Sequence, residues 1–279
     1  MARDLLTLVR TALADRYTVE REIGRGGAAR VFLARTPEGT DVALKVLHPE
    51  LLASTTADRF LREIRLTSRL NHPNIAKLLD SGERDWLVYY VMTYSAGPSL
   101  RAAIDSVRRL TIPDALRVAG DVLGALEHAH AQGIIHRDVK PENIIIAREG
   151  AVLLDFGIAR AIDASVSDQL TRSGMSVGTS RYMSPEQVSS LDTIDHRCDI
   201  YAVGCVLFEC LAGRPPFADR NESLVLQQQL TVPAPDVRTL RSDTPPPLAE
   251  AVARALRKTP SERWSSASEM LLAMGAPPG

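Results

Sequence analysis

Over residues 17–49, hydrophobic and polar positions alternate in the manner of strands and turns, and two more strand-like runs follow before residue 94. The alternation is interrupted by glycine and polar turn residues, and it predicts strands over 17–23, 31–34, 41–47, 75–79 and 86–92. A helix is predicted over 57–70, and it ends before Pro73, which cannot continue a helix. Apolar residues on one face of the segment 1–16 predict a further short amphipathic helix that packs against the body of the protein.

After Gly97 and Pro98 the apolar positions follow a helical period instead. Helices are predicted over 100–107, 112–132, 198–211, 222–229, 248–257 and 266–274. Two short strands are expected around 144–146 and 152–154. A loop from 157 to 184 carries no pattern of its own, and loops of that length are usually functional. The whole pattern predicts an α+β fold, with a β-rich part followed by a larger, mostly helical part.

Composition narrows the class of protein. The 279 residues are 45% hydrophobic, which suits a folded core, and 33 basic residues nearly balance 34 acidic ones. No bulk attraction to nucleic acid is therefore expected. The best apolar run, 201–211, is far shorter than the ~20 residues that cross a bilayer, so no membrane segment is expected. The three cysteines share one apolar stretch, which favours reduced core thiols and a cytoplasmic location.

The densest cluster of reactive side chains lies between residues 136 and 157. His136-Arg137-Asp138-Val139-Lys140-Pro141-Glu142-Asn143 is followed by Asp155-Phe156-Gly157. The two segments place two carboxylates, an amide and an ammonium on neighbouring turns. This is the set that orients a hydroxyl, holds magnesium ions and stabilises a phosphoryl group during transfer.

A glycine-rich turn, Gly24 to Val31, lies between two predicted strands. Its backbone N–H groups could cradle phosphates, although a tight hairpin would show the same residues. A Rossmann dinucleotide turn is disfavoured because a strand follows, not a helix. Lys45, one of only four lysines, sits on the next strand, and Glu63 on the following helix is its natural partner. The joint spacing favours a phosphate site over a surface ion pair.

Together these segments resemble the eukaryotic-like (Hanks-type) protein kinases, and among them most the bacterial serine/threonine kinases, over residues 17–274. Lys140, two residues after Asp138, is similar to serine/threonine rather than tyrosine kinases. The resemblance implies a bilobal fold: an N-terminal helix at 1–16, a small β-rich N-lobe with one main helix at 17–94, a mostly helical C-lobe at 95–274, and a tail or linker at 275–279.

The resemblance also implies roles for the catalytic residues. Asp138 would accept or orient the proton of the substrate hydroxyl, and Lys140 would neutralise charge on the moving phosphoryl group. Asn143 and Asp155 would bind Mg²⁺, with Mn²⁺ as the alternative metal. Lys45, held by Glu63, would reach the phosphates of ATP.

For the nucleotide, the resemblance implies a pocket whose residues come from both lobes. Val31, Ala43 and Ile145 would sandwich the adenine, Met92 would stand behind it, and backbone groups of Thr93 and Ser95 would bind its edge. The complete set implied to bind the nucleotide is Ile23, Gly24, Arg25, Gly26, Gly27, Val31, Ala43, Lys45, Met92, Thr93, Ser95, Ile145 and Asp155.

Two further contacts are expected from the family pattern. Glu186, in Met183-Ser184-Pro185-Glu186, should pair with Arg263. Asp199 should anchor the backbone near His136 and Arg137. Both are scaffold roles, and they indicate a complete C-lobe.

The implied function is a serine/threonine protein kinase that uses ATP and acts on protein hydroxyls. Autophosphorylation of the loop 158–177 would activate it, with Thr171 and Ser173 the favoured sites and Arg137 the cationic partner of the phosphate. A dimer of two kinase domains could carry out this step in trans. Two alternatives stay open: a pseudokinase that keeps the fold without turnover, and a small-molecule phosphotransferase of related fold, although such enzymes generally lack the Lys140 pattern.

Overall fold

The computed structural model describes residues 5–27, 29–48, 57–84, 87–156, 179–189 and 194–275. These residues form two compact units. The first contains the described residues up to Asn71 together with 76–95, and the second contains 72–75, 96–156 and the described residues from 179 onward. The precise lobe boundaries predicted from the sequence stay a prediction.

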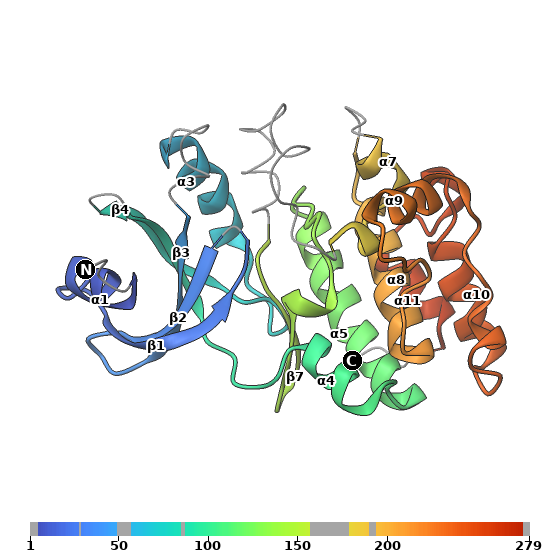
Figure 1. The fold of residues 1–279 in the computed structure, drawn as a ribbon, viewed down its shortest axis with the longest axis horizontal. Coiled ribbons are helices and arrows are strands. Elements are labelled where there is room, and N and C mark those ends of the chain that lie inside the picture. Colours follow the sequence, from blue (N-terminus) through green and yellow to red (C-terminus); the bar gives the residue numbers. More distant parts are fainter. Residues whose placement is uncertain are drawn as a thin grey trace. The chain divides into compact units, whose positions relative to one another are not determined.

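The first unit is built on a five-stranded antiparallel sheet with the strand order β1-β2-β3-β5-β4 (Figure 1). Its strands are β1 (Thr18–Arg25), β2 (Ala29–Arg35), β3 (Asp41–Leu47), β4 (Leu78–Arg84) and β5 (Leu87–Thr93). From Leu87 to Met92 every residue of β5 is buried, because both faces of the sheet are covered. Side chains of alternating residues therefore enter two separate cores.

Helix α3 (Ala57–Leu66), continued by a 3₁₀ turn at Thr67–Arg69, covers one face of the sheet. Helix α1 (Leu5–Ala12) covers the other face, where Val9 and Leu13 are fully buried against Phe32 and Leu44. The amphipathic N-terminal helix predicted from the sequence is confirmed, and it is an integral part of the core.

Shortening Leu13 to alanine is expected to lower the free energy of unfolding by about 2–5 kcal/mol, as core truncations generally do. Leu13 is 0% exposed, so the lost methyl groups would leave a cavity between the N-terminal segment and the sheet. Urea denaturation followed by circular dichroism measures the change. Thr7→Ala, at an exposed position of α1, is the control. A Leu13→Ala protein as stable as this control would contradict the packing described here.

The fourth strand differs from its prediction. The sequence pattern places it at 75–79, but β4 spans Leu78–Arg84, and Ile75 forms only a single parallel bridge with Leu153. Asp80, Ser81 and Gly82 are typical of turns, which hid the strand. They are tolerated here because β4 lies at the edge of the sheet and pairs only with β5.

The second unit is mostly helical, with one two-stranded hairpin (Figure 1). Its helices are α4 (Leu100–Val107), α5 (Ile112–His130), α7 (Pro185–Val188), α8 (Arg197–Ala212), α9 (Glu222–Thr231), α10 (Pro246–Ala255) and α11 (Ala267–Ala273), and its strands are β6 (Ile144–Ala147) and β7 (Gly150–Leu153). The α+β class is thereby confirmed: a sheet with one main packed helix in one unit, and helices in the other. The short α7 was not predicted.

Helix α8 is the centre of the second unit. Every residue from Cys198 to Leu211 is buried, and α5 and α10 pack against it. Burial raises the pKa of all three thiols, and the three cysteines are free, which confirms that they are core thiols. Because the whole circumference of α8 is covered, its few polar residues, Asp199 and Glu209, must find partners inside the protein.

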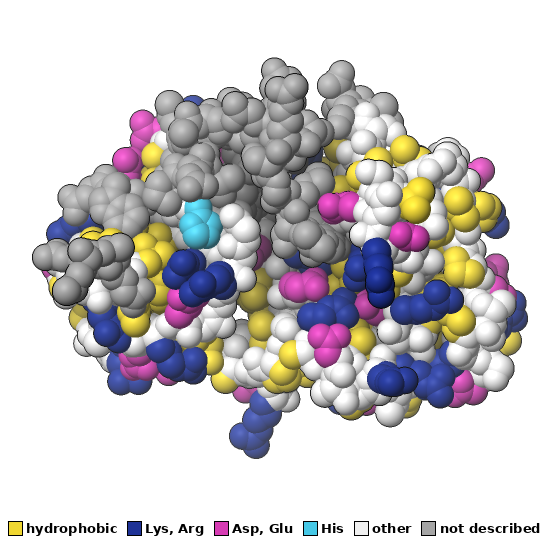
Figure 2. Space-filling model, in the orientation of Figure 1, with side chains coloured by type: hydrophobic (Ala, Val, Ile, Leu, Met, Phe, Trp, Pro, Cys, Tyr) yellow, Lys and Arg dark blue, Asp and Glu magenta, His cyan; other side chains and the backbone are white. Residues whose placement is uncertain are grey.

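Charged side chains of both signs are interspersed over the described part of the face in Figure 2, in keeping with the formal net charge of −1. Within the described ranges, none of the helices combines the length and the apolar character that crossing a bilayer requires.

Candidate active site

A carboxylate in the turn before β6 gathers two of the predicted catalytic side chains. The Lys140 ammonium lies 2.7 Å from Oδ2 of Asp138. The Asn143 amide nitrogen donates to the same oxygen at 2.9 Å and to the Asp138 carbonyl at 2.8 Å. Both of these side-chain contacts reach Oδ2, which leaves Oδ1 of Asp138 as the candidate acceptor for a hydroxyl group. The engaged nitrogen of Asn143 likewise leaves its Oδ1 as the atom that can bind a metal.

The second predicted metal ligand, Asp155, follows β7 and lies beside the same turn. The N–H of Leu154 donates to the Asn143 carbonyl at 2.8 Å, and the His136 ring contacts the Leu154 carbonyl at 2.7 Å. The ring of Phe156 packs edge-on against His136, with centroids 4.6 Å apart. Both neighbours of Asp155 in the chain are thus held by residues of the segment 136–143, which we call the catalytic turn. Its φ of 63° is unusual for a residue with a side chain, and such strain concentrates at functional sites.

Arg137 is also strained, with a φ of 68°, and its backbone is held from both ends. The fully buried Asp199 accepts hydrogen bonds from the N–H of His136 at 2.9 Å and of Arg137 at 2.7 Å. On the other side, the Gln187 side chain donates to the Arg137 carbonyl at 2.8 Å. The anchoring role predicted for Asp199 is therefore confirmed.

A histidine completes the surroundings of Asp199. The His130 Nε2 lies 2.8 Å from its Oδ2. Burial by itself would raise the pKa of Asp199, but the hydrogen bond from His130, with the attraction of His130 and His136 and the backbone bond from His136, holds that pKa below its ordinary value. The carboxylate therefore stays ionised and keeps the catalytic turn in place.

The glycine-rich segment and Lys45 lie in the first unit. The glycine-rich segment is the hairpin between β1 and β2, in which the Gly26 N–H donates to the Ala29 carbonyl at 2.9 Å. Gly26 and Gly27 are exposed. A Cβ on Gly24 would lie 3.5 Å from the Cβ of Val31, directly across the hairpin.

Lys45 and Glu63 are on two elements that pack together. Lys45 lies between Ala43 and Leu47 on β3, and those two neighbours pack against α3, which carries Glu63. Strand side chains two residues apart share a face, so Lys45 belongs to the face that α3 covers. The Lys45 ammonium lies 5.6 Å from the centre of the Tyr90 ring. The ion pair of Lys45 with Glu63, and the meeting of Lys45 with Asp138, stay predictions.

Three of the predicted adenine-binding residues gather in one cluster. Val31, Ala43 and Met92 belong to the core beneath α3, and Ala43 pairs directly with Met92 across β3 and β5. The N–H of Thr93 is already used, because it donates to the Lys77 carbonyl at 3.0 Å, so the carbonyl of Thr93 is its candidate contact with adenine. Ile145 lies on β6 in the second unit, and the sandwich it would complete stays a prediction.

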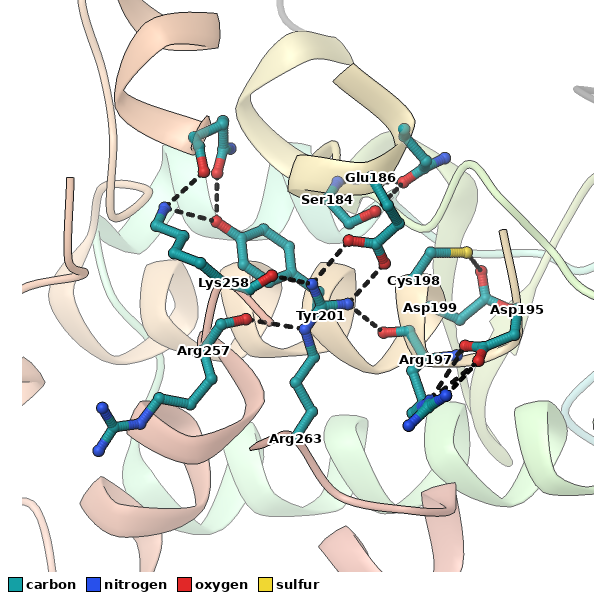
Figure 3. Close-up of polar contacts among 12 residues, drawn as sticks. Ser184, Glu186, Asp195, Arg197, Cys198, Asp199, Tyr201, Arg257, Lys258 and Arg263 are labelled. Carbon is teal, nitrogen blue, oxygen red and sulfur yellow. Dashed lines mark hydrogen bonds and ion pairs between the residues drawn. The ribbon is translucent and has the colours of Figure 1, made fainter. Parts of the chain in front are cut away.

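The predicted scaffold pair is confirmed. The two terminal guanidinium nitrogens of Arg263 donate to the Glu186 carboxylate, at 2.6 and 2.7 Å, and the side chains are 0% and 5% exposed (Figure 3). Arg263 further donates to the carbonyl groups of Arg257, Lys258 and Arg197. The start of α7 is thereby fixed to the chain that precedes α11.

One cluster near the catalytic turn was not predicted. Arg101 on α4 forms a two-pronged pair with the buried Glu209 at 2.9 and 3.0 Å, and it also contacts Glu142 at 3.0 Å and the Tyr182 hydroxyl at 2.6 Å. Burial and the adjacent Glu209 raise the pKa of Tyr182. These residues come from four separate segments, so no local sequence pattern could have joined them. The predicted phosphorylation sites Thr171 and Ser173, with the rest of 158–177, lie outside the described residues.

A family model and individual relatives both place this chain among the protein kinases. Residues 17–273 match the family model of the protein kinase domain. The chain is 37% identical over 260 residues to the serine/threonine-protein kinase PknH of Mycobacterium bovis, covering 92% of this chain and 43% of that relative. It is 40% identical over 266 residues to PknB of Mycolicibacterium smegmatis, covering 92% and 42%, and 39% identical over 276 residues to a probable PknB of Bifidobacterium longum, covering 94% and 40%. The chain thus spans about two fifths of the length of these curated relatives.

Proposed function

The chain belongs to the protein kinase family, and on that premise we propose that it is an active serine/threonine kinase that transfers the γ-phosphoryl group of ATP to protein hydroxyls. One observation carries the proposal: Lys140 and Asn143 both converge on the Asp138 carboxylate, beside Asp155. The names of the relatives, all serine/threonine kinases, support the hydroxyl specificity.

In this mechanism the Asp138 carboxylate accepts the hydrogen bond of the substrate hydroxyl and takes its proton as the hydroxyl oxygen attacks the γ-phosphorus. The bond between the γ-phosphorus and the β,γ-bridging oxygen breaks, and ADP leaves. Lys140, fixed by its contact with Asp138, places positive charge next to the reacting oxygen atoms. Catalysis consists of positioning and electrostatic stabilisation, so the rate of phosphoryl transfer depends on how rigidly the site holds these groups. That rigidity comes from Asp199 and Gln187, which hold the strained backbone of Arg137.

The residues present fit a nucleotide with a hard metal ion. Asn143 and Asp155 offer oxygen ligands, which Mg²⁺ prefers, and Mg²⁺ is usually held by one or two protein ligands together with phosphate oxygens. When bound, the ion neutralises charge on the phosphates. Mn²⁺ fits the same ligand set.

The same geometry disfavours the two alternative functions, a pseudokinase and a small-molecule phosphotransferase. A pseudokinase has no need for a carboxylate held by both an ammonium and an amide, yet Asp138 has both. A small-molecule phosphotransferase has no need for a platform for a peptide chain beside the catalytic turn, yet α7 is fixed there by Arg263 and by the bond from Gln187 to Arg137. We therefore favour protein substrates.

Incubation with radiolabelled ATP, MgCl₂ and myelin basic protein tests the function. We expect label in the acceptor that depends on the metal, disappears with EDTA, and is found in phosphoserine and phosphothreonine after acid hydrolysis. Label confined to phosphotyrosine would contradict the specificity. ATP hydrolysis without any labelled protein would contradict the substrate class.

Activation by autophosphorylation of 158–177, in trans within a dimer and in the cytoplasm, is part of the proposal. In its support, Nε of Arg137 is buried without a hydrogen-bond partner among the described residues, so a guanidinium beside Asp138 still has a donor to offer. A phosphate is a strong acceptor for such a group. Mass spectrometry of the protein from the same incubation identifies the modified residues, and an active enzyme with an unmodified loop would end this part of the proposal.

A further inference from the structure

The segment from Thr179 to Gln187 is bound to the catalytic turn at two points. Arg101 contacts both Glu142 in the turn and Tyr182 in the segment, and the Gln187 side chain donates to the Arg137 carbonyl. An acceptor chain that presents a hydroxyl to Asp138 must therefore pass close to this segment. Whatever fixes the segment also shapes the surface that receives the acceptor.

Gln229 on α9 holds the middle of this segment from the inside of the protein. Its side-chain nitrogen donates to the carbonyl of Arg181 at 2.7 Å and to that of Ser180 at 3.3 Å. Its side-chain oxygen accepts a hydrogen bond from the Tyr201 hydroxyl. Gln229 is 0% exposed, and both ends of its amide are engaged. A buried amide is retained only when its partners are in place, so the 180–181 backbone is held at one position.

Lys258 fixes the helix that carries Gln229. Its ammonium donates to the Gln229 carbonyl at 2.6 Å and to the Gln228 carbonyl at 3.1 Å. It also donates to the Tyr201 hydroxyl at 3.3 Å (Figure 3). Those carbonyls lie in the last turn of α9, where a cation is favourable. The ammonium also lies 4.3 Å from the centre of the Phe217 ring. Burial lowers the pKa of Lys258 to about 8, so the group is still largely charged at pH 7.

Tyr201 connects this arrangement to the confirmed scaffold pair. Its hydroxyl meets Gln229 and Lys258, and the Arg263 guanidinium that binds Glu186 lies 4.9 Å from the centre of its ring (Figure 3). The Tyr201 side chain on α8 therefore supports two segments. Through Gln229 it supports the backbone at 180–181, and through Arg263 it supports the start of α7. Gln229 acts on the backbone of Ser180 and Arg263 on Glu186, whereas Asp138 is held by Asn143 and Lys140.

We propose that Gln229, braced by Lys258 and Tyr201, is a positioning residue for the protein substrate: it fixes the backbone at Ser180 and Arg181 that the acceptor chain meets. This inference rests on the proposed kinase function. It predicts that loss of the Gln229 amide weakens binding of the acceptor while the binding of ATP is unchanged. If Gln229 contributed only to stability, its loss would not raise the KM for the acceptor while leaving the KM for ATP unchanged.

The test compares Gln229→Met with Gln227→Met, a matched change at an exposed position of the same helix. Methionine keeps the length of the side chain but leaves the carbonyls of Ser180 and Arg181 without their donor. With myelin basic protein as the acceptor, we expect the acceptor KM to rise roughly tenfold in Gln229→Met, and the KM for ATP to stay within about twofold. Gln227→Met should match the wild type in both.

Tyr201→Phe serves as the second variant and removes only the hydroxyl that orients the Gln229 amide. It should raise the acceptor KM in the same direction by a smaller factor, and it decides the matter if Gln229→Met does not fold. An unchanged acceptor KM in the folded variants, or an equal rise in both Michaelis constants, would overturn the inference. A wild-type protein that labels neither the acceptor nor itself would instead refute the proposed function.

Discussion

Replacing Asp138 with asparagine is expected to lower the rate of phosphoryl transfer by roughly 10²–10⁴-fold, the usual effect of removing a general base. The change preserves the size of the side chain but removes its charge and its ability to take a proton. It also weakens the contact with Lys140, whose ammonium lies 2.7 Å from Oδ2. The proposed metal ligands Asn143 and Asp155 keep their own side chains, so ATP binding should survive.

Transfer to myelin basic protein measures the rate, and isothermal titration calorimetry with ATP and Mg²⁺ measures nucleotide binding. Asp243→Asn is the control, because this carboxylate in the same unit is 67% exposed and pairs with Arg241 at 3.2 Å. It should keep full activity. Equal turnover in Asp138→Asn and Asp243→Asn would remove Asp138 from the mechanism. A loss of ATP binding in Asp138→Asn would show that the residue acts on the nucleotide instead.

The second large effect is expected from Arg263→Met, which should lower the free energy of unfolding by about 3–5 kcal/mol. The loss of Arg263 leaves the Glu186 carboxylate, 5% exposed, without its cation. Three backbone carbonyl groups lose their donor as well. The asymmetry is physical: a buried pair contributes little compared with apolar residues, but one uncompensated buried charge is severely destabilising.

Thermal or urea denaturation of three variants separates these causes. Arg238→Met breaks a pair with Asp236 of similar length, 2.7 Å, whose side chains are 50% and 42% exposed, and it should change stability by only ~0–1 kcal/mol. The double variant Glu186→Gln, Arg263→Met should be more stable than Arg263→Met alone, because no charge stays buried. If Arg263→Met is no more destabilising than Arg238→Met, the buried pair has little structural importance.

The sequence alone was enough to predict those features that depend on local spacing. Asp138, Lys140 and Asn143 lie within six residues, so a single turn brings them together, and the contacts of Asn143 with Asp138 follow from that turn. The helix that begins at Leu5 was predicted because its apolar residues recur on one face. The pairing of Glu186 with Arg263 was predicted from the family resemblance, since 77 residues separate the partners.

Features that depend on tertiary contacts alone were missed. Arg101, Glu142, Tyr182 and Glu209 come from distant segments, and each by itself resembles an ordinary surface residue. Gln229 stands in a run of three glutamines, and nothing in that run shows which one is buried. Strand β4 was shifted because an edge strand tolerates the polar residues that usually mark a turn.

Helix α1 has a practical consequence for anyone who shortens this protein. The family match begins at residue 17, but the hydrophobic layer beneath the sheet is completed by Val9 and Leu13, which precede it. A truncation at the family boundary would expose Phe32, Leu44 and their neighbours to water. Together they would form a continuous hydrophobic surface of the kind that drives aggregation. Recombinant versions intended for crystallography or inhibitor screening should therefore retain the residues ahead of the matched region.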